Sequence, residues 1–397
     1  MQMGPKYHID GTENFGYITS NRFLYSFYMY MNTVNRITSL YQCASVQNLK
    51  GYVAHFCLLR LRSFDTFIKV VLEHKDYVSA NCLLRMLGDC VAVFRLIYME
   101  QDKDLLILRH SLYVIDGCER NLEVLPEKNV NDDSLPEEEL AASIKTTQIN
   151  RAHRQRLIHE AQDMLDASPL KQKNKAAFEK IVEDRNWKFK EFKDYEKKGN
   201  NQYKWRELYE LIDCCKGFDL LSYISQYAHG LSMSNLVIKL NEQNVNGVVG
   251  EATGLIKRLH KYTLAFYPEE QMYILEGLLE PDMRDKILAC YDEKHRPDVA
   301  TWNQDVMKKM CQLRDNGYYD IKNNLPFCCE TSWNEINQLK YISELVIQIF
   351  ILKEMFKFQI WLSFLNIINN ILKDCSIFYE GEDEEFIKEL IILIKVI

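Results

Sequence analysis

The sequence predicts an all-α protein, with one main multi-helix bundle and a smaller helical C-terminal part. Glycine and proline are scarce, with 15 and 8 in 397 residues, and apolar residues recur at helical spacing rather than in the alternation of strands. The chain is 47% hydrophobic and 26% charged, which is ordinary for a globular protein and excludes disorder throughout. We expect the main bundle over residues 1–267, with an internal linker at 126–139, and a C-terminal helical region over 268–397.

Three long helices are predicted in the N-terminal quarter of the chain. They span residues 17–38, 53–74 and 77–100. Each gathers large apolar side chains on one face, as helices that pack against a core do. Together they predict the start of a helical bundle.

A polar and acidic stretch with two prolines, residues 126–139, is the clearest linker. It ends in the pattern of a helix start, because Ser134 can cap, Pro136 suits the first turn and Glu137 completes a capping box. A long charged helix should follow, and then a second helix over 174–198. The lysines near the end of that second helix are interleaved with acids, which favours a solvated face over a nucleic-acid patch.

The stretch 208–236 is predicted to contain a helix that runs into Gly230 and carries polar groups on its apolar face. Ser222, Ser225 and His229 share that face. Ser225 and His229 are four residues apart and can hydrogen-bond, and His229 would lie beside the unpaired carbonyls of the last turn. A buried histidine paired with a neighbouring hydroxyl for structural reasons is the plainer interpretation.

The predicted helix 77–100 also places polar residues in register beside its apolar stripe. Arg85 and Asp89 form a pair four residues apart. An exposed pair of this kind contributes only about 0.3–0.5 kcal/mol and indicates nothing about function. A pair that faces the interior needs further partners, and His229 is the natural candidate. We therefore expect Arg85, Asp89 and His229 to lie close together.

Two short segments resemble a family of uncharacterised, mainly bacterial helical proteins that share a domain of unknown function. They are NCLLRMLGD at 81–89 and YISQYAH at 223–229. In that family a helix with Arg-x-x-x-Glu precedes a helix with Ser-x-x-x-His. The likeness extends over about residues 17–267.

This resemblance implies a helical fold and a candidate site formed by Arg85, Asp89, Ser225 and His229. Asp89 stands where the family usually has glutamate, and the shorter carboxylate puts its contact with Arg85 in doubt. The family has no assigned reaction, so the resemblance implies no activity.

A third segment, RQRLIH at 154–159, resembles the site of HEPN nucleases from defence and toxin systems. In those enzymes a histidine follows an arginine by four to six residues. The resemblance implies that His159 would activate the RNA 2′-hydroxyl and that Arg154 would stabilise charge on the phosphate, without metal. Chance alone is expected to give such a spacing in a chain with nine histidines. A solvated face of a charged helix is the competing interpretation.

The C-terminal region should begin with short helices opened by Pro281 and Pro297 and end in a long helix over about 332–372. That last helix is apolar almost all round. Lys353 and Lys357 interrupt it, so we expect a buried helix or a homodimer surface rather than a membrane span.

Composition and motifs limit the partners, the cellular setting and the cofactors that we expect. The net charge of −7 argues against a general nucleic-acid coat. The twelve cysteines are scattered without a CxxC pair, which indicates free thiols and a cytoplasmic setting, and no signal sequence is expected. No phosphate-binding loop or dinucleotide fingerprint is present, so no cofactor or metal is predicted.

These observations favour a binding or scaffold protein with a polar centre at Arg85, Asp89 and His229. One alternative is a HEPN-like, metal-independent ribonuclease or phage-defence effector, for which RNA would be the partner. The other is a small-molecule enzyme that uses Arg85 and His229.

Overall fold

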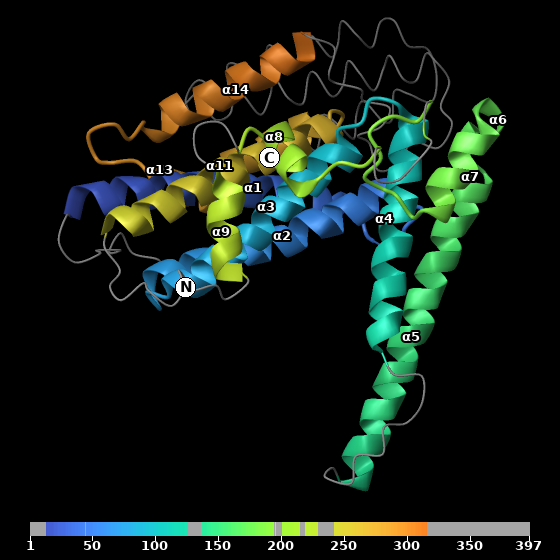
Figure 1. Ribbon diagram of the computed structural model, residues 1–397. Coiled ribbons are helices and arrows are strands. Elements are labelled where there is room, and N and C mark those ends of the chain that lie inside the picture. The colour runs from blue at the N-terminus through green and yellow to red at the C-terminus, as the bar shows by residue number, and fades with distance from the viewer. Residues whose placement is uncertain are drawn as a thin grey trace, which may run out of the picture. The chain divides into compact units, whose positions relative to one another are not determined.

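In the computed structural model, all regular secondary structure of the described residues is helical (Figure 1). The described residues are 13–43, 45–125, 136–193, 195, 201–214, 219–228 and 242–315. The prediction of an all-α protein is confirmed. The chain divides into two compact units, Met1–Arg296 and Pro297–Ile397.

The first unit has a core of long helices packed against one another (Figure 1). Their bounds are Glu13–Leu40 for α1, Leu49–Leu72 for α2, Tyr77–Tyr98 for α3 and Glu242–Phe266 for α11. The three helices predicted for the N-terminal quarter are confirmed. Asn48 and Asp76 begin α2 and α3, because each side chain accepts a hydrogen bond from a backbone N–H of the first turn. The interior is rich in buried rings, among them Phe23, Tyr30, Phe64, Phe67, Phe94 and Tyr98.

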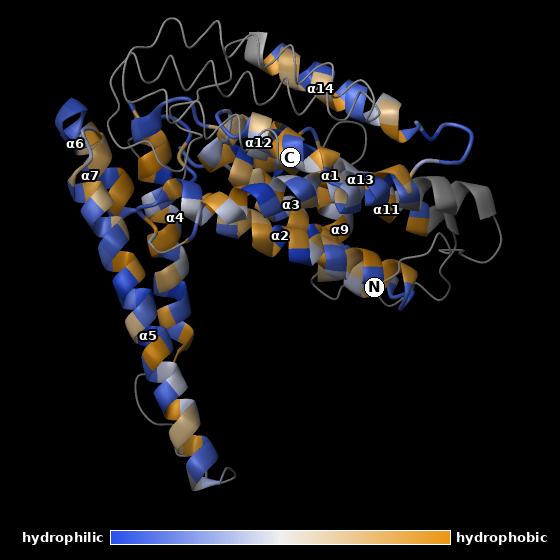
Figure 2. Cartoon of the chain, turned by 180° about the vertical axis from the view of Figure 1, so that it is seen from behind, coloured by the Kyte–Doolittle hydropathy of each residue, from blue (hydrophilic) through white to orange (hydrophobic). Residues whose placement is uncertain are grey.

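Helix α4 (Lys103–Val124) pairs with α5 (Glu137–Asp166) in an antiparallel hairpin (Figure 1). Most of α5 is hydrophilic, with apolar side chains at intervals (Figure 2). Its less exposed side chains repeat at steps of four and three, as in a coiled-coil seam. They include Leu140, Ile144, Thr147, Arg151, Arg154, Ile158, Ala161 and Leu165. Helix α4 is not among the helices predicted from the sequence. The prediction that Ser134 caps α5 is wrong, because Pro136 is the N-cap residue and no described side chain caps the helix.

The predicted helix over 174–198 is wrong beyond Glu183. After α6 (Leu170–Lys173), helix α7 spans Lys175–Glu183, and the chain then leaves helical geometry at Arg185, whose φ is 49°. Its continuation folds back on itself, with an isolated bridge between Phe189 and Gln202.

Arg109 of α4 explains why this segment is not helical. Its side chain is buried and donates hydrogen bonds to the carbonyls of Trp187 and Phe189, at 3.3 and 2.8 Å. A buried guanidinium needs acceptors, and backbone carbonyls outside a helix are free to provide them. Asn201 holds the other side of the turn, where its side-chain oxygen accepts from the backbone N–H groups of Lys190 and Glu191.

The helix predicted within 208–236 is also interrupted. It is divided into α8 (Trp205–Leu211) and α9 (Leu220–Ala228), and Asp213 between them has a φ of 55°. Ser222 does not face the core as expected. It is exposed, and its hydroxyl donates to Asp219 at the start of α9. His229 and Gly230 lie outside the described residues.

The first unit continues past residue 267, the boundary predicted from the sequence, to Arg296. Three short helical elements follow α11 and pack against α1. They are α12 (Gln271–Glu276), η1 (Gly277–Leu279) and α13 (Pro281–Leu288), and Pro281 opens α13 as predicted.

The second unit contributes α14 (Val299–Asp315) to the described part of the chain. The apolar helix expected over about 332–372, with its suggested homodimer surface, lies outside that part. None of the helices in the described ranges has the length and apolarity needed to cross a bilayer.

Gly88 allows α8 to approach α3 closely. A Cβ at this position would lie 2.9 Å from Cζ of Tyr209, whose ring is fully buried and cannot move aside freely. Gly117 provides the opposite case, because a Cβ there would meet nothing within 4 Å.

We expect Gly88→Ala to lower the free energy of unfolding by roughly 1–3 kcal/mol, because overpacking outweighs the gain in helix propensity. Gly117→Ala should leave stability unchanged or raise it by up to about 1 kcal/mol. Urea unfolding of both variants measures the difference. Equal effects of the two substitutions would contradict the close packing of Tyr209 against α3.

Among the described histidines, His110 is buried and His260 is partly buried. The ring of His110 lies between Tyr98, whose hydroxyl is 3.1 Å from Nδ1, and the carbonyl of Val46, 2.9 Å from Nε2. His260 lies 2.8 Å from the hydroxyl of Thr33. Burial lowers the pKa of each imidazole to about 4.

Stability should therefore fall as the pH decreases from 6.5 toward 4, the ordinary and the folded-state pKa values of these histidines. Between these pH values the unfolded chain binds protons that the folded chain does not bind. The free energy of unfolding therefore falls by about 1.4 kcal/mol per pH unit for each histidine. Urea unfolding across the window, in wild type and in His110→Gln, measures the slope. The slope should be shallower in His110→Gln, because this variant lacks one of the two imidazoles with a lowered pKa.

Candidate functional site

The strongest candidate site is a polar centre on α3 around Arg85. Nε and Nη2 of Arg85 each lie 3.1 Å from a carboxylate oxygen of Asp89, so the ion pair is bidentate. Nη1 donates to Oγ of Ser225 on α9 at 3.0 Å. The Arg85 side chain is only 16% exposed and that of Asp89 27%. The structure thus brings together three of the four residues predicted for this site.

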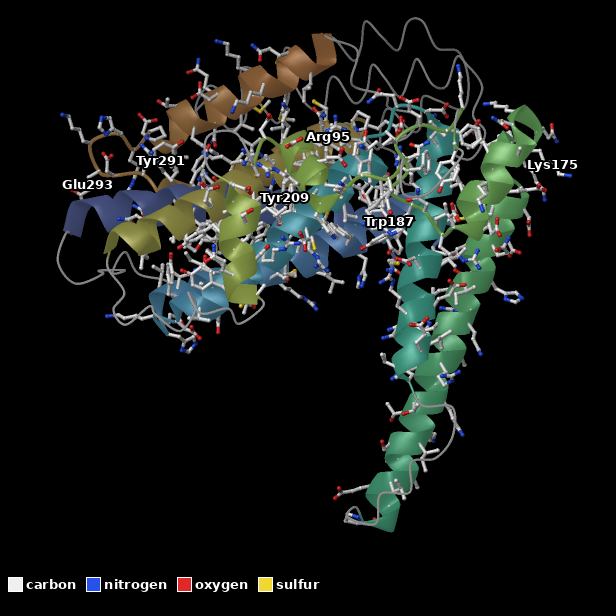
Figure 3. All side chains as sticks on the ribbon, in the orientation of Figure 1. Arg95, Lys175, Trp187, Tyr209, Tyr291 and Glu293 are labelled. Carbon is white, nitrogen blue, oxygen red and sulfur yellow. The ribbon has the colours of Figure 1, made fainter. Side chains whose placement is uncertain are left out.

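Aromatic residues of α8 complete the centre. The guanidinium carbon of Arg85 lies 5.5 Å from the ring centroid of Tyr209 and 5.7 Å from that of Trp205. The hydroxyl of Tyr209 donates to the carboxylate of Asp89 at 3.0 Å. Tyr209 is labelled in Figure 3. One charged pair therefore joins three helices, α3, α8 and α9.

Burial sets the protonation of this centre. It raises the pKa of Asp89, and the positive charge of Arg85 and the hydrogen bond from Tyr209 offset part of that effect. Burial also raises the pKa of Tyr209, reinforced by the neighbouring Asp89 charge. The phenol therefore stays protonated and remains a hydrogen-bond donor to Asp89.

Ser225 is arranged as a connector between elements rather than as a nucleophile. Its Oγ accepts from Arg85, and the hydroxyl proton is directed to the carbonyl of Leu221 at 2.6 Å. A nucleophilic serine instead needs a base that can take its proton. His229, the base expected from the sequence, lies outside the described residues, and its convergence with Arg85 and Asp89 stays a prediction.

Neither aromatic partner of Arg85 was predicted from the sequence. Tyr209 and Trp205 lie more than a hundred residues away along the chain, and nothing in their local pattern indicates the contact. Gly88 gave the one available signal, because a glycine inside a helix can mark the close approach of another element.

Arg154 and His159 have different surroundings on α5. Nε of Arg154 donates to the side chain of Asn121 on α4 at 3.0 Å. One turn earlier, Arg151 donates to the carbonyls of Leu122 and Leu125 near the end of α4, at 3.1 and 2.6 Å. Both arginines thus hold the hairpin together.

His159 is exposed. Five residues separate it from Arg154, which is about 140° around a helix, so the two side chains leave α5 in different directions. This geometry favours a structural role for Arg154 and a solvated position for His159.

No metal centre is indicated in the described part of the chain, where no three histidine, cysteine or acidic side chains gather in a suitable group. The cysteines of that part are free thiols. Comparisons of the chain with protein-family models, curated proteins and solved structures find no match. The two resemblances seen in the sequence therefore remain predictions, and the site is interpreted from its own geometry.

We expect Arg154→Ala to lower the free energy of unfolding by roughly 1 kcal/mol, through loss of the bond to Asn121. His159→Ala should change it by less than about 0.5 kcal/mol, as exposed substitutions usually do. Neither wild type nor variant should cut single-stranded RNA in metal-free buffer. RNA cleavage that His159→Ala abolishes would reinstate the nuclease hypothesis.

Proposed function

We propose that this chain is a helical binding or scaffold protein whose Arg85 centre is structural. In this proposal Arg85, Asp89 and Ser225 hold α8 and α9 on α3, and they do not act on a substrate. The proposal rests on the contacts of Arg85, because each nitrogen of its guanidinium lies against an acceptor of its own chain. Asp89 and Ser225 accept hydrogen bonds from the Arg85 guanidinium. The rings of Tyr209 and Trp205 lie beside it.

The enzyme alternative would require different geometry at the same residues. A catalytic arginine directs donors toward the position where charge develops on the substrate. The donors of Arg85 are instead directed at Asp89 and Ser225, and the proton of Ser225 is bound to a backbone carbonyl. These contacts support a structural role over small-molecule catalysis.

The positions of Arg154 and His159 support the ribonuclease alternative less than they support a structural role for Arg154. It would need Arg154 and His159 to face one groove, whereas Arg154 is bound to Asn121 and His159 is exposed on another side of α5. We therefore advance no nuclease function.

Arg85→Gln should lower the free energy of unfolding by about 2 kcal/mol, because it leaves the half-buried carboxylate of Asp89 without its counter-charge. Arg120→Gln is the matched control. Arg120 forms an ion pair of the same spacing with Asp116 on α4, but its side chain is 74% exposed. Its replacement should change stability by less than about 0.5 kcal/mol. Urea unfolding at neutral pH measures both.

The double variant Arg85→Gln/Asp89→Asn should recover part of the lost stability, because it removes the unpaired charge. Catalytic groups are commonly held at the expense of stability, so their removal often stabilises the fold. An Arg85→Gln protein as stable as wild type, or more so, would count against the structural role and in favour of the enzyme alternative.

A further inference from the structure

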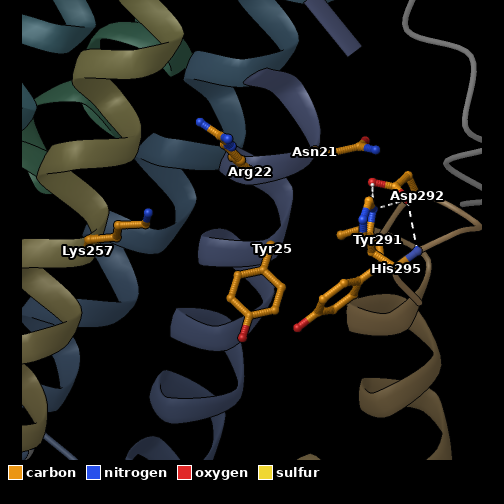
Figure 4. Close-up of a pocket in the computed structure, with 8 residues that line it drawn as sticks. Asn21, Arg22, Tyr25, Lys257, Tyr291, Asp292 and His295 are labelled. Atoms are coloured by element: carbon orange, nitrogen blue, oxygen red, sulfur yellow. Dashed lines mark hydrogen bonds and ion pairs between the residues drawn. The ribbon is translucent and has the colours of Figure 1, made fainter. Parts of the chain in front are cut away.

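A pocket of about 590 Å³ lies in the first unit, apart from the Arg85 centre. It is formed where α1 and α11 meet the segment that follows α13 (Figure 4). Its size is within the range of sites for small organic ligands, about 300–1,000 Å³. The charged, imidazole and aromatic side chains that line it are Arg22, Tyr25, Lys257, Tyr291, Asp292 and His295.

The pocket presents positive charge that the described part of the chain does not neutralise. Arg22 from α1 and Lys257 from α11 are both exposed, and neither side chain forms an ion pair or hydrogen bond with another described residue. This contrasts with Arg85, whose three guanidinium nitrogens each contact an acceptor of the chain. Two like charges that share a pocket favour an anion between them.

Among the described residues that line the pocket, one is acidic, Asp292, and its carboxylate is hydrogen-bonded to His295. Both carboxylate oxygens of Asp292 lie close to Nδ1 of His295, at 2.7 and 2.9 Å, and one of them also accepts from the His295 backbone N–H at 3.0 Å. Figure 4 shows this pair on the side opposite Lys257, with Tyr25 and Tyr291 between them. The carboxylate therefore lies apart from Lys257.

Aromatic rings form the middle of the pocket. Tyr25 and Tyr291 meet edge to face, with ring centroids 5.6 Å apart and planes at 89°. Such a pair offers both a ring face and ring edges to a planar ligand. Burial raises the pKa of Tyr25, so its phenol remains a hydrogen-bond donor.

The described thiol that lines the pocket, Cys290, is not activated. Burial raises the pKa of Cys290 to about 12, and its thiol donates to the carbonyl of Lys286. A protonated thiol is a poor nucleophile, so these surroundings suit reversible binding.

We infer that this pocket binds a small aromatic anion, with its charged group beside Lys257 and Arg22 and its ring against Tyr25 and Tyr291. The inference deepens the proposed binding function by naming a ligand class. It uses none of the residues of the Arg85 centre, so the two proposals can fail separately. Loss of stability in Arg85→Gln tests the structural role of Arg85, and ligand binding tests the function of the pocket.

Phenyl phosphate is the probe, titrated into the full chain by calorimetry. Inorganic phosphate carries the charge without the ring, and benzyl alcohol carries the ring without the charge. Phenyl phosphate should bind more tightly than either, because only it uses both halves of the pocket. Added salt should weaken its binding, since the cationic side chains are exposed.

Lys257→Gln and Tyr291→Leu should each weaken phenyl phosphate binding by roughly tenfold. Lys261→Gln is the matched control. Lys261 is an exposed lysine one turn further along α11 that does not line the pocket, and its replacement should leave binding unchanged. Circular dichroism verifies that each variant retains its helical content.

Three outcomes would overturn the inference. The first is no binding of phenyl phosphate by the wild-type protein. The second is equal binding of inorganic phosphate or benzyl alcohol, which would leave either the ring or the charge without a role. The third is equal weakening by Lys261→Gln and Lys257→Gln, which would assign the attraction to the surface of α11 as a whole.

Discussion

The guanidinium of Arg85 determines how three helices of the first unit meet. A cation that is largely withdrawn from water must regain hydrogen bonds and counter-charge inside the protein. Asp89 provides the counter-charge from the same helix, but Ser225 and Tyr209 come from α9 and α8. Because these partners are distant in sequence, burying one charge fixes the positions of two short helices. Gly88 makes the arrangement sterically possible.

The same constraint operates on α4. Arg109 is 3% exposed and takes its acceptors from backbone carbonyls between α7 and α8, while His110 is paired with the carbonyl of Val46 ahead of α2. Long helices satisfy their own backbone groups, whereas the segments between them do not. Buried polar side chains on the long helices thus hold the irregular segments of the first unit in place.

Five cations of the described chain differ in their partners. Arg85, Arg109 and Arg154 are bound to their own chain, and each joins one element to another. Arg22 and Lys257 line a pocket and have no such partner among the described residues. A cation satisfied internally contributes to the fold, and one left facing a pocket is available to a ligand. The division supports a binding protein over a catalyst centred on Arg85.

The sequence by itself determined α1, α2, α3 and α5, and the pairing of Arg85 with Asp89. Both depend on periodicity within one helix, and residues four apart lie on the same side of it wherever that helix packs. Tertiary structure alone decided where α7 ends, where α8 and α9 separate, and that Tyr209 joins Arg85. It also decided that Arg154 faces α4. Each of these depends on an acceptor or a ring from a distant segment, and local periodicity carries no information about such partners.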